Sequence, residues 1–158
     1  MGQLLTRRIE LPDEAATIQL GRRIARSLPA QPAGWLVLLQ GDLGAGKSTL
    51  ARAILRELGH TGAVPSPTYT LVEPYEVDSR SVYHIDLYRI ASPDELEYLG
   101  WDDLSDGLRI VEWPERIPGL EADADLHIGL DYAGDGRMAV LRAVSSRAAP
   151  VLQGMDLK

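Results

Sequence analysis

At residues 41–48 the chain reads Gly41-Asp42-Leu43-Gly44-Ala45-Gly46-Lys47-Ser48, which matches the pattern G-x-x-x-x-G-K-[ST]. Glycines let a backbone curl so that successive N–H groups converge on phosphate oxygens. In such loops the lysine reaches the β- and γ-phosphates of a nucleotide, and the hydroxyl that follows it is a ligand for Mg²⁺. The stretch therefore predicts a loop that binds nucleotide phosphates.

The residues on either side of this loop fit the same interpretation. Residues 35–40 are expected to form a buried parallel strand, because 35–39 are a continuous apolar run. Apolar residues recur with helical spacing over 50–58, and Gly59 ends that helix. A helix that begins directly after the loop adds its positive N-terminus to the phosphate site.

The other expected elements complete an α/β pattern. A helix opens at 11–14 and carries an apolar stripe to Leu28, and a capping-box sequence at Ser92 starts a short helix. Strand-like segments cover 68–77 and 81–90 as one hairpin, 108–113, and 125–132 and 137–144 as a second hairpin. This order predicts a P-loop NTPase-like three-layer sandwich with a mixed central sheet, because two hairpins must join a parallel core.

Length and composition limit the possible classes of protein. The 158 residues suit one domain, which we expect over 1–146, and residues 147–158 show no pattern and are expected to form a flexible tail. There is no cysteine, and no apolar run is long enough for a bilayer, so we expect a cytoplasmic protein without a membrane partner. The net charge of -7 argues against a protein that grips a nucleic-acid backbone by itself.

A P-loop enzyme also needs an acid at the end of a neighbouring strand to hold Mg²⁺ directly or through water. Two residues are candidates for that role: Glu112 ends an apolar strand before Pro114, and Asp86 ends another strand-like run. We favour Glu112 as the metal ligand. For Asp86 three roles stay open: contact with the metal, contact with water, or a role as a sensor. Thr68 is a candidate for closing on the γ-phosphate, although plain turn chemistry explains it equally well.

Two other kinds of site find less support. The chain has no Asn-Lys-x-Asp, which disfavours a guanine-specific GTPase. His84 and His127 lie within strand patterns, where packing is the simpler interpretation, and no His and carboxylate groups show a metal-ligand spacing.

Four motifs in order give the chain a family resemblance. They are 41–49 (GDLGAGKST), 66–73 (SPTYTLVE), 84–89 (HIDLYR) and 111–114 (VEWP). Together they resemble the bacterial TsaE (YjeE) family of small P-loop ATPases, and the resemblance runs from about Leu11 to about Val144.

The resemblance implies a role in making threonylcarbamoyladenosine in tRNA. Members of the family bind ATP or ADP with Mg²⁺, hydrolyse ATP slowly alone, and act on a TsaD–TsaB pair in which TsaD transfers the threonylcarbamoyl group. The tRNA is reached indirectly, through that complex. The chain is thus expected to be a Mg²⁺-dependent ATPase whose partners are TsaD and TsaB.

The resemblance also assigns roles to individual residues. Lys47, Asp86 and Glu112 match catalytic positions, and Ser48 and Glu112 match the Mg²⁺ ligands. Nucleotide-binding positions match Glu14, Gly41, Asp42, Leu43, Gly44, Ala45, Gly46, Lys47, Ser48, Thr49, Glu115 and Arg137. Many family members have Thr where this chain has Ser48, and both residues offer the hydroxyl.

Two other functions remain as alternatives. A P-loop small-molecule kinase would use the same loop and would phosphorylate a metabolite without any partner. A nucleotide-responsive binding module would use ATP to order a loop such as 66–70 and switch an interface, without turnover of consequence.

Overall fold

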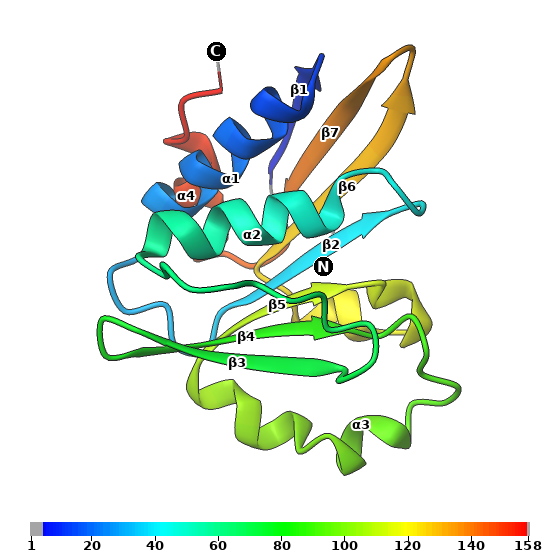
Figure 1. Cartoon of the computed structure of the whole chain (residues 1–158). Helices are drawn as coiled ribbons and strands as arrows, with labels where there is room; N and C mark the ends of the chain where they lie inside the picture. Colours follow the sequence, from blue (N-terminus) through cyan, green and yellow to red (C-terminus); the bar gives the residue numbers. More distant parts are fainter. Residues whose placement is uncertain (1–4, 158) are drawn as a thin grey trace.

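The computed structural model describes residues 5–157, and one mixed seven-stranded sheet organises them (Figure 1). The strand order is β1-β7-β6-β2-β5-β4-β3. Strands β2, β5, β4 and β6 run parallel where they pair, and the hairpins β3–β4 and β6–β7 and the pair β1–β7 are antiparallel. The strands are β1 (Leu5–Leu11), β2 (Leu36–Gly41), β3 (Val72–Val77), β4 (Arg80–Asp86), β5 (Leu108–Glu112), β6 (Leu126–Ala133) and β7 (Gly136–Ala143).

Helices cover the two faces of the sheet unequally. On one face lie α1, α2 and α4, which share a core with the inward residues of β1, β2, β6 and β7 (Figure 1). On the other face, the short α3 and the 3₁₀ turns η1, η2 and η3 pack against β2, β4 and β5. Their bounds are α1 (Glu14–Ser27), α2 (Lys47–Leu58), α3 (Glu95–Tyr98), α4 (Ala148–Gln153), η1 (Trp101–Asp106), η2 (Pro114–Arg116) and η3 (Leu120–Asp123). The expected three-layer α/β sandwich with a mixed sheet is confirmed.

The first helix begins later than the sequence predicts, because a strand occupies the residues before it. Strand β1 extends to Leu11 and pairs with β7 along its whole length. Helix α1 begins at Glu14, and the Asp13 side chain caps it by accepting a 2.9 Å hydrogen bond from the Ala16 N–H. Asp13 therefore separates an edge strand from helix α1, which packs on α2.

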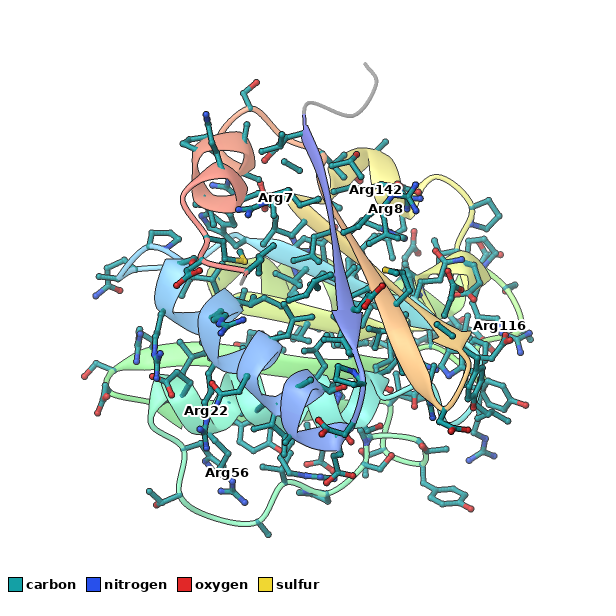
Figure 2. All side chains as sticks on the ribbon, turned by 90° about the horizontal axis from the view of Figure 1, so that it is seen from above. Arg7, Arg8, Arg22, Arg56, Arg116 and Arg142 are labelled. Carbon is teal, nitrogen blue, oxygen red and sulfur yellow. The ribbon has the colours of Figure 1, made fainter. Side chains whose placement is uncertain are left out.

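The expected loose tail over 147–158 is wrong for most of that segment. Residues 148–153 form α4, and Ala148, Leu152 and Met155 are buried in the main core. The Arg7 guanidinium on β1 donates to the backbone carbonyls of Leu152 at 3.0 Å and Met155 at 2.5 Å, and Figure 2 shows it between the strand and this helix. Contacts with β1, which lies at the other end of the chain, thus order the C-terminal segment.

The first hairpin is shorter than the sequence predicts. The first hairpin begins at Val72 rather than residue 68 and stops at Asp86 rather than residue 90. Residues 66–71 instead form a loop that returns to β4, where the Asp86 N–H donates to the Leu71 carbonyl at 2.9 Å. No helix within residues 5–157 is long and apolar enough to span a membrane.

Candidate functional site

The loop at 42–46 joins the central strand β2 to helix α2, as the sequence predicts. Gly44 and Gly46 have φ of +79° and +110°, which side-chain-bearing residues rarely adopt. A Cβ on Gly41 would lie 2.6 Å from the Leu130 carbonyl oxygen, so the loop also begins where only glycine fits. The backbone therefore follows a tight path that side chains would block.

Side chains hold four successive carbonyls of this loop. The ammonium of Lys47 donates to the Gly41 and Asp42 carbonyls at 2.5 Å and 3.0 Å. From the β6–β7 hairpin, the Tyr132 hydroxyl donates to the Leu43 carbonyl at 2.6 Å and the Arg137 guanidinium to the Gly44 carbonyl at 3.0 Å.

The Lys47 ammonium also lies over an aromatic ring. Its Nζ is 4.3 Å from the ring centroid of Trp113, within the range of a cation–π interaction. Burial lowers the pKa of Lys47, and the nearby carboxylates of Glu112, Glu115 and Asp86 act in the opposite direction. The cation is thus desolvated and surrounded by acids, which is a favourable setting for exchanging its carbonyl partners for phosphate oxygens.

Ser48 and Glu112 form the part of the site that suits a divalent cation. Ser48 Oγ, in the first turn of α2, donates to Glu112 Oε1 at 3.2 Å. Glu112 is the last residue of β5 and is 2% exposed. Its other oxygen, Oε2, lies 2.5 Å from Nε2 of the equally buried His84 on β4.

Asp86 lies beside Glu112 because β4 and β5 are parallel and pair in register at these two residues. Its carboxylate accepts hydrogen bonds from the Tyr88 N–H at 2.8 Å and the Thr68 hydroxyl at 3.3 Å. Burial raises the pKa of Asp86 and the negative charge of Glu112 raises it further, while these two hydrogen bonds oppose the shift. A carboxylate with a raised pKa is suited to accepting a proton near neutral pH.

One cavity of about 280 Å³ is lined by Lys47, Ser48, Asp86, Glu112 and Trp113 together with part of the loop. A second cavity of about 170 Å³ lies on the other side of the loop and shares Gly44, Gly46 and Thr49 with the first. The first is lined by Leu43, Gly44, Gly46, Lys47, Ser48, Thr49, Thr68, Asp86, Tyr88, Glu112 and Trp113. The loop therefore borders both cavities. Asp86 and Glu112 line only the first, whereas Asp13, Glu14 and Asp135 line the second.

Comparison with known proteins shows the family to which this chain belongs. The family model described as "Threonylcarbamoyl adenosine biosynthesis protein TsaE" matches residues 11–139, most of the chain. The chain belongs to the TsaE family.

Individual TsaE relatives match over most of their own length. The tRNA threonylcarbamoyladenosine biosynthesis protein TsaE of Haemophilus influenzae is 43% identical over 150 residues, which cover 92% of this chain and 95% of that protein. The protein of the same name from Synechocystis sp. is 47% identical over 116 residues, covering 70% and 71%. The crystal structure of Bacillus subtilis YdiB is similar with a TM-score of 0.77 and 25% identity, over 97% of this chain and 95% of that one.

The remaining residues that the TsaE resemblance assigned to the nucleotide lie at two different cavities. Glu14, Ala45 and Arg137 line the second cavity beside the loop. The side chains of Asp42 and Glu115 line a different cavity of about 230 Å³, together with residues of β6 and β7. Glu115 lies there because Trp113 adopts a left-handed backbone conformation (φ +59°) that turns the chain away from the end of β5.

A Mg²⁺ ion fits the oxygen atoms that the TsaE site presents. Residues 5–157 contain no cluster of three His, Cys, Asp or Glu side chains that would hold a metal by themselves. Mg²⁺ at nucleotide sites needs no such cluster, since phosphate and water oxygens supply most of its ligands. Adjacent corners of its octahedron lie about 2.9 Å apart, which is close to the 3.2 Å between Ser48 Oγ and Glu112 Oε1.

Sequence reasoning missed three residues of this site: His84, Trp113 and Tyr132. His84 precedes Asp86 by two residues on one strand, and that spacing places both side chains on the same face of the sheet. This signal was available, but packing was the simpler interpretation. Trp113 and Tyr132 contact the loop region from segments far away in the sequence, and no local sequence pattern predicts such contacts.

Proposed function

We propose that this protein binds ATP or ADP with Mg²⁺, hydrolyses ATP slowly alone, and supports a TsaD–TsaB complex in the threonylcarbamoyladenosine modification of tRNA. Membership of the TsaE family supports the pathway, because the relatives are named for tRNA threonylcarbamoyladenosine biosynthesis. One observation carries the ATPase part of the proposal. The phosphate-type loop, a hydroxyl, and two strand-end carboxylates all line one cavity.

Each residue has a physical role in this proposal. The free N–H groups of the loop and the N-terminus of α2 bind the phosphates. Lys47 neutralises phosphate charge after leaving its carbonyl partners, and Ser48 and Glu112 hold the metal. When bound, Mg²⁺ supplies the charge that stabilises the transferring phosphoryl group.

Asp86 is positioned to act on the water that attacks the phosphate. Its carboxylate is fixed by the Tyr88 N–H and the Thr68 hydroxyl, and it lies on the strand next to Glu112. The raised pKa of Asp86 makes it a stronger proton acceptor than an exposed aspartate. We therefore assign Asp86 to orienting and deprotonating water, and Glu112 to the metal.

Measurement of phosphate release with Mg²⁺ tests the proposal, first with the protein alone and then with the TsaD–TsaB pair. We expect a slow basal rate that the pair raises, and a loss of about 10²–10³-fold of the stimulated rate in Lys47→Ala and Glu112→Gln. Glu97→Gln, an exposed change on α3, is the matched control and keeps the full rate.

Three outcomes would contradict the proposal. Full stimulated activity in either site variant would refute the assigned roles of Lys47 and Glu112. A phosphorylated metabolite formed without the partner pair would instead support a small-molecule kinase. Nucleotide-dependent binding of the pair that is unchanged when hydrolysis is blocked would support a binding module.

A further inference from the structure

The His84 imidazole is buried directly beneath the acidic part of the site. The side chain is 2% exposed, and its Nε2 lies 2.5 Å from Glu112 Oε2. An ionised carboxylate only accepts hydrogen bonds, so the imidazole donates in this contact. The bond links the interior of β4 to the last residue of β5.

Burying this imidazole carries a cost that the fold alone does not require. Its second nitrogen, Nδ1, has no hydrogen-bond partner among the described residues. On the same face of β4, the preceding inward residue is Val82, which lies in the apolar core. A branched apolar side chain at 84 would fill such a position without an orphaned polar atom. Compared with an apolar side chain at position 84, the histidine therefore provides one additional feature, the hydrogen bond to Glu112.

That contact determines which carboxylate oxygen faces the cavity. Oε2 is occupied by the His84 N–H, so the carboxylate cannot rotate without breaking a buried hydrogen bond. Ser48 Oγ lies 3.2 Å from Oε1 and 3.4 Å from Oε2, but only Oε2 also contacts His84. Oε1 is thereby the oxygen left for a metal, at a distance from Ser48 Oγ that suits two ligands of one Mg²⁺. A free glutamate side chain would sample several rotamers, and few of them present Oε1 in this way.

We infer that His84 is a positioning residue, which orients Glu112 as a metal ligand by donating to Oε2. This inference rests on the proposed function, because it requires that Ser48 and Glu112 hold a divalent cation. Partners of this kind, which contact a ligand rather than the metal, typically change metal affinity by about 10–100-fold when they are lost. We expect the loss of His84 to weaken the binding of the metal and not the binding of the nucleotide itself.

Direct metal binding tests this inference without relying on turnover. Mn²⁺ stands in for Mg²⁺, and electron paramagnetic resonance measures the free Mn²⁺ during a titration of the protein–ADP complex. His84→Leu replaces the imidazole with an apolar side chain of similar size and so removes the donor, and His84→Gln keeps a donor at a similar reach. His127→Leu is the matched control, because His127 is also a buried strand histidine with a polar partner, Gln40, but lies outside the proposed site.

We expect His84→Leu to weaken Mn²⁺ binding by about 10–100-fold, and His84→Gln to recover most of the loss. ADP affinity measured in EDTA should match that of the wild type in both variants, and His127→Leu should bind Mn²⁺ normally. If His84→Leu does not fold, the comparison moves to His84→Asn, whose shorter amide does not reach Glu112 Oε2.

Three outcomes would show whether the role of His84 or the proposed function itself is wrong. Unchanged Mn²⁺ affinity in the variant without a donor would overturn the role of His84. An equal loss of Mn²⁺ and of metal-free ADP binding would also overturn it, because it would show a merely structural effect. A wild-type protein that binds neither ADP nor Mn²⁺ would instead refute the proposed function.

Discussion

Replacing Gly21 with alanine is expected to force apart α1 and the phosphate-loop helix α2. A Cβ on Gly21 would lie 2.5 Å from the Ala53 Cβ, 3.0 Å from the Leu50 carbonyl oxygen and 3.3 Å from the Ile54 nitrogen. Carbon atoms in contact are normally about 3.5–4.0 Å apart, so the helices must separate by about 1 Å. Two of the three contacts are with backbone atoms, which cannot rotate out of the way.

The magnitude follows from two opposing terms. Overpacking a well-packed core costs about 1–3 kcal/mol, and backbone contacts place this site near the upper end. Alanine in a helix interior is favoured over glycine by about 0.8–1.0 kcal/mol. The expected net loss for Gly21→Ala is therefore about 2 kcal/mol, or about 4–8 °C in the melting temperature of a domain of this size.

Urea unfolding followed by circular dichroism measures this loss, and a double-mutant cycle identifies its cause. Ala53→Gly removes the methyl group that Gly21→Ala meets, at a cost of about 1–2 kcal/mol for propensity and lost burial. If the clash is the cause, the double variant Gly21→Ala/Ala53→Gly is more stable than the sum of the two single losses predicts. The 2.5 Å contact with the Ala53 methyl group is then removed, while the contact with the Leu50 carbonyl oxygen remains. Additive losses in the double variant, or a Gly21→Ala protein as stable as the wild type, would refute the packing argument.

Three further predictions concern the sheet and the C-terminal segment. Asp125→Asn should cost about 3 kcal/mol in urea unfolding, because the carboxylate accepts hydrogen bonds from the Leu36 N–H, Ser145 and Arg147. Burial opposes ionisation of Asp125, but these bonds outweigh it and lower its pKa, so the difference from wild type should persist above about pH 4 and shrink as the pH falls below it. Leu152→Ala, at a fully buried position of α4, should lower the free energy of unfolding by about 2 kcal/mol; no loss would contradict the packing of this helix. Arg7→Met should leave most of the core intact but speed proteolysis after residue 147, seen by mass spectrometry; an unchanged rate would show that the Arg7 hydrogen bonds do not hold this segment.

The parts of the fold that local pattern specifies were predictable from the sequence. The loop at 41–48 has a glycine pattern, a continuous apolar strand before it and an amphipathic helix after it, and all three carry signals within a few residues. Glu112 and Asp86 could be expected near the loop, since polar residues at the carboxyl ends of parallel strands meet at one edge of the sheet.

Elements that depend on long-range pairing were not predictable in the same way. Strand β1 alternates in burial along 5–11, but its identity depends on pairing with β7, more than 120 residues away. Helix α4 is six residues long and has no capping signal, so it is stabilised by contacts with β1 and the core rather than by its own propensity. The His84–Glu112 contact has the same origin, because only the β4–β5 register brings the two side chains together.

The topology of the sheet explains which elements support the loop at 42–46. Strand β2 lies in the middle of the sheet, so its loop has β5 and β4 on one side and the β6–β7 hairpin on the other. The hairpin supplies Tyr132 and Arg137, which hold the Leu43 and Gly44 carbonyls. These two bonds hold the loop from the side of the hairpin, while within the loop the Ala45 N–H donates to the Asp42 carbonyl at 3.0 Å and the Lys47 ammonium donates to the Gly41 and Asp42 carbonyls. In the proposed function, Lys47 exchanges these two neutral carbonyls for charged phosphate oxygens, which are the stronger acceptors.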